Sequence, residues 1–185
     1  MVTLGMDEVG RGCWAGPVVA GAVILGQPIA GLRDSKKLTK KQRQKMSAEI
    51  QIKAVAIGIG WVAAEEVDEL GLSGAVKLAM QRAFEQITGD YDEIIIDGNV
   101  NFLAENPKAK AVIKADDSVP AVSAASIIAK VARDNFMVER ATAYPDYGFD
   151  KHVGYGTALH LEKLKLYGTC ELHRLSFKPV RALLQ

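Results

Sequence analysis

Three short apolar runs, each bounded by glycine or charged residues, lie in the N-terminal part of the chain. They cover residues 2–7, 17–25 and 54–61, and their composition predicts strands. A glycine-rich turn joins the first two, and all three are close in sequence, so we expect an antiparallel meander. Two later runs, 93–96 and 111–113, are apolar almost throughout, which is typical of parallel strands that are buried on both faces.

Helical periodicity fills the intervals between these runs. We expect one helix from an N-cap at Thr39 to about Lys53, and another that is capped by Ser73. The second helix has an apolar stripe at helical spacing, formed by Val76, Met80, Ala83, Phe84 and Ile87. Strands followed by alternating helices and strands predict an α/β domain with a mixed sheet.

A long helix is predicted from Pro120 to about Thr142. Most of its residues are apolar, which indicates burial, yet five polar residues share one stripe: Ser123, Ser126, Lys130, Arg133 and Asp134. Exposure of the stripe to solvent and contact with an active site both account for it. Beyond about residue 145 the pattern predicts loops, with helices over 155–167 and near 179–184.

The 185 residues suit one domain, which we expect to span 1–185. The composition, 49% hydrophobic and 24% charged, is that of a globular protein, and no apolar run approaches the roughly 18 residues of a membrane span. The N-terminus lacks the features of an export signal. The two cysteines, Cys13 and Cys170, have no metal-binding spacing, so we expect a reduced, cytoplasmic protein.

Charge is unevenly distributed along the chain. Residues 33–45 contain seven basic residues against Asp34 alone, although the whole chain has a net charge of +1. Such a block is typical of contact with a polyanion, but it is also typical of a solvated helix face. Both interpretations stay open at this point.

Carboxylates follow the ends of three predicted strands: Asp7 with Glu8, Asp97, and Asp116. Taken singly, Asp97 fits a turn and Asp116 fits a helix cap. Acids that are delivered together to one edge of a sheet repel one another unless cations bind there. Carboxylate oxygens without a histidine or cysteine set favour Mg²⁺ or Mn²⁺ over zinc.

Adjacent residues of a regular strand point to opposite faces, so Asp7 and Glu8 share one site only if the strand ends there. Gly10 and Gly12 indicate that it does. The histidines are scattered along the sequence, and we expect them at the surface or beside a substrate: His152, His160 and His173.

Two oxygen-liganded cations about 4 Å apart activate a water and stabilise the leaving oxygen in a phosphoryl displacement. This chemistry suits a nuclease, a transferase or a phosphatase. The basic block gains a purpose in a nuclease, because lysine and arginine would hold the polyanion near the cations.

The chain resembles the ribonuclease HII family, the type 2 ribonucleases H, over nearly its whole length. The resemblance rests on motifs that occur in order: Asp7-Glu-Val-Gly-Arg-Gly12, Asp34-Ser-Lys-Lys-Leu38, Ile96-Asp-Gly-Asn99, Lys114-Ala-Asp116, the segment 123–134, Tyr147-Gly-Phe149, Gly154-Tyr155 and Ser176-Phe177. It implies a ribonuclease H-like fold, with a five-stranded mixed sheet flanked by helices and a helical C-terminal part from about residue 145.

The resemblance also implies an activity. It implies an endonuclease that cleaves the RNA strand of RNA–DNA hybrids and incises 5′ to single ribonucleotides embedded in duplex DNA, as in ribonucleotide excision repair. The products would carry 5′-phosphate and 3′-hydroxyl ends. The implied cofactor is Mg²⁺ or Mn²⁺, with two ions during catalysis.

Individual residues gain implied roles in the same way. The family's catalytic, metal-binding carboxylates match four residues: Asp7, Glu8, Asp97 and Asp116. The loop that contacts the 2′-hydroxyl and adjoining phosphates matches three: Gly10, Arg11 and Gly12. Tyr155 matches the tyrosine that recognises the RNA–DNA junction. Phosphate contacts are implied for Lys36 and Lys37, and support of the site for Lys130 and Asp134.

Three alternatives compete with this interpretation. The ribonuclease HIII family shares the fold and the acids, but it usually has an extra N-terminal domain and a lysine in place of Arg11. A non-catalytic nucleic-acid-binding module on the same fold would have damaged acids. A metal-dependent phosphatase gives no role to the basic block or Tyr155. We expect a monomer without membrane contact, and a sliding-clamp partner is left undecided.

Overall fold

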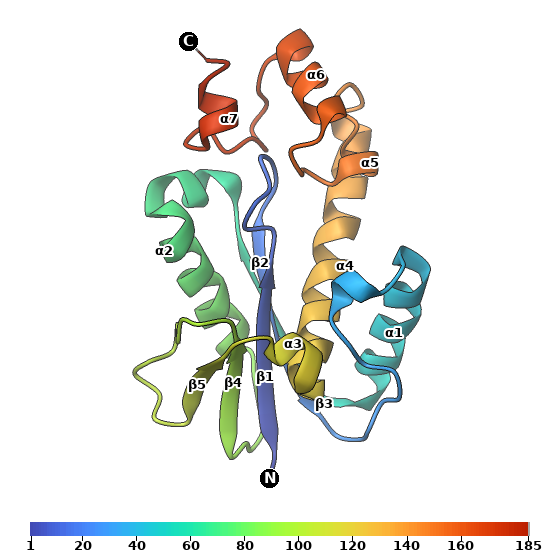
Figure 1. Ribbon diagram of the computed structural model, residues 1–185, viewed down its shortest axis with the longest axis vertical. Helices are drawn as coiled ribbons and strands as arrows, with labels where there is room; N and C mark the ends of the chain where they lie inside the picture. The colour runs from blue at the N-terminus through green and yellow to red at the C-terminus, as the bar shows by residue number, and fades with distance from the viewer. Residues whose placement is uncertain (185) are drawn as a thin grey trace.

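A computed structural model describes residues 1–184, and Gln185, the last residue of the predicted domain, lies outside the described residues. At the centre is a five-stranded sheet in the order β3-β2-β1-β4-β5 (Figure 1). The strands are β1 (Thr3–Val9), β2 (Val18–Leu25), β3 (Ala54–Val62), β4 (Glu93–Asp97) and β5 (Ala109–Val112). The first three form the predicted antiparallel meander, and β4 and β5 run parallel to β1. The predicted mixed sheet is confirmed.

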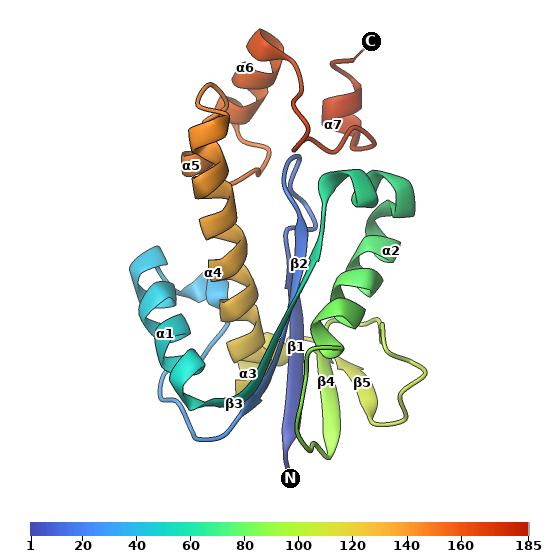
Figure 2. The ribbon, with the colours of Figure 1, turned by 180° about the vertical axis from the view of Figure 1, so that it is seen from behind.

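Helices cover both faces of this sheet (Figures 1 and 2). α2 (Ala64–Phe84) packs on one face, and α4 (Pro120–Ala143) packs on the other with α1 (Lys40–Lys53) beside it. Because side chains alternate along a strand, the central strands contribute to two separate cores. Leu4 belongs to the core under α2, and Val23 belongs to the core under α4.

Two glycines allow α4 to lie directly against the sheet. A Cβ atom at Gly5 would come within 2.1 Å of the Ala121 carbonyl carbon, and one at Gly21 within 2.4 Å of the Ala125 carbonyl oxygen. Any larger residue at either position would therefore push the helix away. This close approach brings the first turns of α4 next to Asp7, which pairs with Gly21.

Helix α2 begins earlier than the sequence pattern predicts. We expected a helix capped by Ser73, but α2 begins at Ala64 and ends at Phe84, before Ile87. Gly71 interrupts it with φ of 69° and ψ of 164°, so two helical segments meet at a kink. The predicted helix corresponds to the segment after this glycine turn, and the segment before it was missed.

Short helices form the C-terminal part beyond α4 (Figure 1): α5 (Phe149–His152), α6 (Ala158–Tyr167) and α7 (Lys178–Arg181). The sequence pattern did not predict α5, because four residues carry too little periodicity. It also placed the start of α6 at 155 and the end of α7 at 184, where the structure has Ala158 and Arg181. Within residues 1–184, every helix is too short or too polar to cross a membrane.

The histidines do not lie at the surface, which was one of the two expected locations, and the other, beside a substrate, stays a prediction. His152, His160 and His173 are buried, and their rings pack around Phe149 in the C-terminal part. The rings of His152 and His160 are stacked, with centroids 4.2 Å apart. Burial lowers the pKa of His160 and of His173 to about 4, because the charged imidazolium loses its hydration.

These lowered pKa values predict that the protein loses stability as the pH falls. Between pH 6.5, the ordinary histidine pKa, and about 4, the unfolded chain binds more protons than the folded chain. The stability that depends on neutral His160 and His173 is complete above pH 6.5 and is lost as the pH falls toward 4.

Urea denaturation of wild type and His173→Gln at a series of pH values from 7.5 to 4.5 checks this prediction. The denaturation midpoint of the wild type should fall with pH, and the variant should show a shallower dependence because one such group is gone. Identical pH dependences would contradict the prediction.

Candidate metal centre and its surroundings

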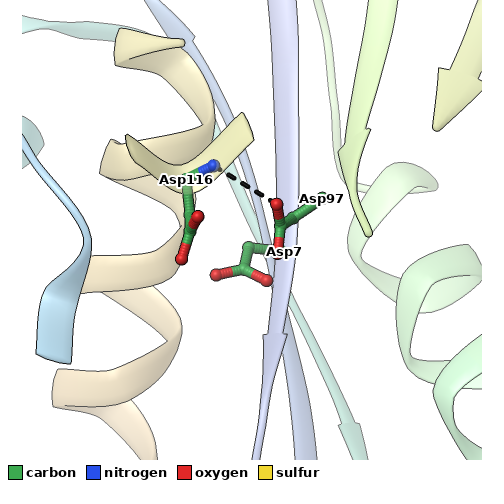
Figure 3. Close-up of side chains that lie close together, drawn as sticks. All are labelled: Asp7, Asp97 and Asp116. Carbon is green, nitrogen blue, oxygen red and sulfur yellow. Dashed lines mark hydrogen bonds between the residues drawn. The ribbon is translucent and has the colours of Figure 1, made fainter. Parts of the chain in front are cut away.

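Three carboxylates from separate elements meet where β1 and β4 approach their carboxyl ends (Figure 3). Asp7 lies on β1, Asp97 ends β4, and Asp116 lies in the short helix α3 (Ala115–Ser118). Met6 pairs in parallel with Ile96, so the residues that follow them, Asp7 and Asp97, stand side by side. One oxygen from each of the three acids lies within 4.8 Å of the other two.

A left-handed turn places the third acid. Lys114 has φ of 59°, which is uncommon for a residue with a side chain, and it turns the chain into α3. The Ala115 and Asp116 N–H groups then both donate to Asp97 Oδ1, at 2.8 and 3.3 Å. Ser123 Oγ donates to the Asp116 carbonyl oxygen at 2.7 Å and so ties α3 to α4. Asp97 and Asp116 are thereby fixed relative to one another.

The acids are close enough to repel one another. Burial raises the pKa of Asp7 well above its usual value, and the charges of Glu8 and Asp97 raise it further. Burial also raises the pKa of Asp116, with further contributions from Asp97 and Asp34. Such a cluster is unfavourable until a cation neutralises it, and carboxylate oxygens are the ligands that Mg²⁺ and Mn²⁺ prefer. The donor set therefore fits a divalent cation.

Glu8 does not join this cluster. We expected the strand to end at the two acids, but β1 continues to Val9, and Glu8 pairs with Ala20 of β2. Neighbours on a strand face opposite sides, so Asp7 faces α4 and Glu8 faces away from it. Glu8 Oε1 accepts a hydrogen bond of 2.9 Å from Arg11 Nη1. The predicted strand end is wrong, and the role of Glu8 as a metal ligand stays a prediction.

Part of the basic block borders the acids. Lys36 and Lys37 lie in the 3-10 helix η1 (Ser35–Lys37), with both side chains mostly exposed. Lys36 Nζ lies 3.8 Å from Asp116 Oδ2, and Lys37 Nζ donates to Asp117 Oδ1 at 2.7 Å. Lys36 thus lies between an acid of the cluster and solvent, and Lys37 lies next to it beside Asp117, which favours the polyanion interpretation. The other lysines of the block lie on the exposed face of α1: Lys40, Lys41 and Lys45.

The polar stripe of α4 is largely buried rather than exposed to solvent. Ser126 Oγ shares a hydrogen bond of 2.9 Å with Ser35 Oγ of η1. Lys130 Nζ donates to Asp134 Oδ1 at 2.8 Å, and Asp134 Oδ2 lies 3.9 Å from Arg43 Nη2 of α1. The stripe thus joins α4 to the basic block on the side of the sheet that carries Asp7.

The loop after β1 contains two glycines with different requirements. Gly10 has φ of +92°, and a Cβ there would come within 2.4 Å of Arg133 Nε, so the fold requires glycine. At Gly12, a Cβ would meet no atom of the described residues within 4 Å. Packing therefore gives no reason for glycine at this second position. Between them, the Arg11 side chain is half exposed and bonds to Glu8.

Two fully buried arginines hold this loop, and sequence reasoning missed their function. Arg133 donates to three carbonyl oxygens and Arg174 to two, chiefly on residues 11–17, at 2.8–3.1 Å. Arg133 belongs to the predicted stripe. Arg174 had no sequence signal, because its partners are more than 150 residues away in the chain.

Tyr155 lies beside the same loop. Its backbone forms an isolated antiparallel bridge with Cys13, and its ring centroid lies 5.0 Å from Lys130 Nζ. Burial raises the pKa of its hydroxyl to about 12, so the hydroxyl keeps its proton at neutral pH. The residue is 37% exposed, which leaves part of the ring accessible.

Comparison with known proteins identifies relatives over the whole chain. The family model described as ribonuclease HII matches residues 4–180. The ribonuclease HII of Marinomonas sp. (strain MWYL1) is 50% identical over 183 residues, which cover 98% of this chain and 92% of that protein.

Solved structures share the fold. The ribonuclease H2 from Pyrococcus horikoshii OT3 has a TM-score of 0.82 at 26% identity, with 99% of this chain and 97% of that chain covered. Bst-RNase HIII in complex with Mn²⁺ has a TM-score of 0.77, with 100% of this chain and 69% of that chain covered. The similarity to Bst-RNase HIII, at 21% identity, is evidence for a shared fold only. The predicted ribonuclease H-like fold is confirmed.

Asp7→Asn should stabilise the protein when divalent cations are removed. The neutral amide takes a buried charge out of a repelling cluster, so the melting temperature in EDTA should rise by about 2–4 °C, the shift that about 1 kcal/mol produces in a chain of this size. Added Mn²⁺ should raise the melting temperature of the wild type but have little effect on the variant.

The exposed acid Asp90 supplies the control, because Asp90→Asn should keep the wild-type response to Mn²⁺. Differential scanning fluorimetry measures all three proteins. A lower melting temperature for Asp7→Asn in EDTA, or an undiminished response to Mn²⁺, would contradict the account of the cluster.

Proposed function

The chain belongs to the ribonuclease HII family, and from that membership we propose that it incises duplex DNA on the 5′ side of single embedded ribonucleotides. Membership makes it a ribonuclease H, an endonuclease that acts on RNA–DNA hybrids. The finer proposal concerns the single ribonucleotide and the products, which would carry 5′-phosphate and 3′-hydroxyl ends.

The convergence of Asp7, Asp97 and Asp116 is the observation that carries this proposal. These residues would hold Mg²⁺ or Mn²⁺, which when bound supplies the positive charge that activates a water and stabilises the leaving 3′-oxygen. The protein itself contributes the positions of the carboxylate ligands. Backbone N–H groups orient the Asp97 carboxylate, and Ser123 fixes the backbone of Asp116, so the ligands are ordered in advance despite their repulsion.

Basic side chains around the cluster would hold the nucleic-acid backbone. Lys36 lies at the acids, Lys37 lies next to it, and Arg11 lies just beyond β1. Phosphate contacts of this kind fix the register of a duplex, so the scissile phosphate would lie over the carboxylates. Arg11 bonds to Glu8 in this structure, and exchange of that partner for a phosphate would free the Glu8 carboxylate. Glu8 would then become a further ligand only if the end of β1 also turns.

Two features at the loop after β1 would recognise the 2′-hydroxyl, the group that distinguishes RNA from DNA. The open space at Gly12 permits a close approach of substrate to the backbone. Tyr155 offers a partly exposed ring that would pack on a sugar and a protonated hydroxyl that would form a hydrogen bond.

The alternative functions have less support. Ribonuclease HIII shares the fold, but the family model and the relative at 50% identity are both ribonuclease HII. A non-catalytic module would not need three intact acids in one cluster. A phosphatase leaves the position of Lys36 and the accessible ring of Tyr155 without a role.

Asp116→Asn should abolish incision of a labelled duplex that contains one ribonucleotide, assayed with Mg²⁺ or Mn²⁺. We expect a loss of at least about 100-fold, because loss of a ligand exceeds the 10–100-fold effect that is typical of residues behind the ligands. The matched control is Asp117→Asn, since this neighbouring acid lies outside the cluster and pairs with Lys37. The control should retain incision, whereas equal losses in both variants, or no incision by the wild type, would refute the proposal.

Gly12→Ala should separate recognition from stability. The added methyl group meets no described protein atom, so the melting temperature should stay at the wild-type value, while incision should fall about tenfold because the backbone no longer approaches the substrate. Gly10→Ala is the contrasting variant, because strain and contact with Arg133 should lower its melting temperature. Full incision by Gly12→Ala would contradict the role given to this position.

A further inference from the structure

Three buried histidines converge on Tyr155 and the residue before it. His173 Nε2 lies 3.0 Å from His160 Nε2, and His160 Nδ1 lies 2.9 Å from the Tyr155 carbonyl oxygen. His152 stacks on His160 and accepts the Gly154 N–H at Nδ1, at 3.1 Å. Metal chemistry at the acids uses none of these rings, so their arrangement needs a separate explanation.

The hydrogen-bond partners assign the proton on each ring. A carbonyl oxygen can only accept, so His160 Nδ1 carries the proton and Nε2 of the neutral ring is bare. His173 Nε2 must therefore donate to it, which leaves His173 Nδ1 to accept the Cys170 N–H at 2.9 Å. Complete burial keeps both rings neutral, as their lowered pKa values indicate. Donation thus runs in one direction, from Cys170 through two imidazoles to Tyr155.

The last hydrogen bond of this series, from His160 to Tyr155, is made to the short segment that joins α5 to α6. Tyr155 lies between α5 and α6, where its N–H donates to the His152 carbonyl oxygen and its carbonyl oxygen accepts the Thr157 N–H, both at 2.9 Å. His160 supplies a second donor to that same carbonyl oxygen. The side chain of Tyr155 has its ring centroid 5.0 Å from Lys130 Nζ.

We propose that His160 is a positioning residue for ribonucleotide recognition: held by His173, it fixes the backbone of Tyr155 through the Nδ1–H bond to the carbonyl oxygen. The inference rests on the proposed function, because the role of Tyr155 comes from there. It adds a hydrogen-bonded pair of histidines, outside the metal site, that fixes the position of Tyr155 relative to the 2′-hydroxyl.

A purely structural role of the rings is the alternative. His160 packs against Trp14 and Phe149, with ring centroids 5.5 and 5.9 Å away, so its loss would also loosen the core. Loosening would lower the melting temperature and slow cleavage of every substrate alike. A positioning role instead changes the preference for a single ribonucleotide over a continuous RNA–DNA hybrid.

Two amide substitutions at this position separate the two roles. Asparagine places its amide near the position of Nδ1, so His160→Asn keeps the donor to Tyr155 and loses the link to His173. Glutamine reaches the position of Nε2, so His160→Gln keeps the link and loses the donor. Both remove the ring from the same site, and circular dichroism and melting temperatures record the effect on the core.

The measurement is kcat/KM for a duplex with one ribonucleotide and for a continuous hybrid. His160→Gln should lower the first about tenfold more than the second, the effect of one lost hydrogen bond in a buried site, and His160→Asn should keep the wild-type ratio. Tyr155→Ala is the reference variant, which should have lost the preference for a single ribonucleotide completely. Equal ratios in both amide variants would overturn the inference alone. Failure of the wild type to incise at a single ribonucleotide would overturn the proposed function and this inference with it.

Nitrogen-15 NMR of the histidine rings in the intact wild type tests the same geometry without a substitution. At pH 7 we expect His160 to be protonated at Nδ1 and His173 at Nε2. Protonation of His160 at Nε2 would overturn the inference even if both variants failed to fold.

Discussion

Carboxylates that are buried side by side oppose folding, because each raises the pKa of the others and none is well hydrated. Asp7 and Asp116 are buried beside the half-buried Asp97 at the edge of the sheet, and burial and neighbouring charges raise the pKa of Asp7 and of Asp116. Parallel pairing of β1 with β4 sets the first two side by side, and a left-handed turn at Lys114 adds the third. The protein thus keeps together charges that only a bound cation relieves.

Helix α4 connects this cluster with the parts of the molecule that would meet substrate. Its first turns lie against β1 because Gly5 has no side chain, and Ser123 bonds to the backbone of Asp116. About three turns further along, Arg133 holds the loop that follows β1. The same helix places Lys130 over the ring of Tyr155. Metal ligands, loop and tyrosine are therefore supported by one rigid element.

Much of this arrangement could be predicted from the sequence because it depends on local patterns. Apolar runs locate the strands, and acids at the ends of parallel strands must share an edge, which brings Asp7 and Asp97 together. Prediction failed where long-range contacts decide the outcome. The strand continues through Glu8 because β2 pairs with it as far as Val9, although the glycines suggested an earlier end.

Other parts of the site carry no periodic signal at all. The partners of Arg174 are far away in the sequence, and the histidines at 152, 160 and 173 come from different elements. Only the folded chain shows that these rings are buried together. The sequence led us to expect the basic block to hold a polyanion near the cations, but the specific contact of Lys36 with Asp116, 80 residues away, is seen only in the folded chain.

Anomalous diffraction from crystals soaked in Mn²⁺ would test most directly whether the three acids bind a divalent cation. A divalent cation centre predicts an anomalous peak within coordination distance of carboxylate oxygens from Asp7, Asp97 and Asp116, and loss of that peak in Asp7→Asn. Ordered Mn²⁺ elsewhere on the protein, with no peak at the three acids, would contradict it.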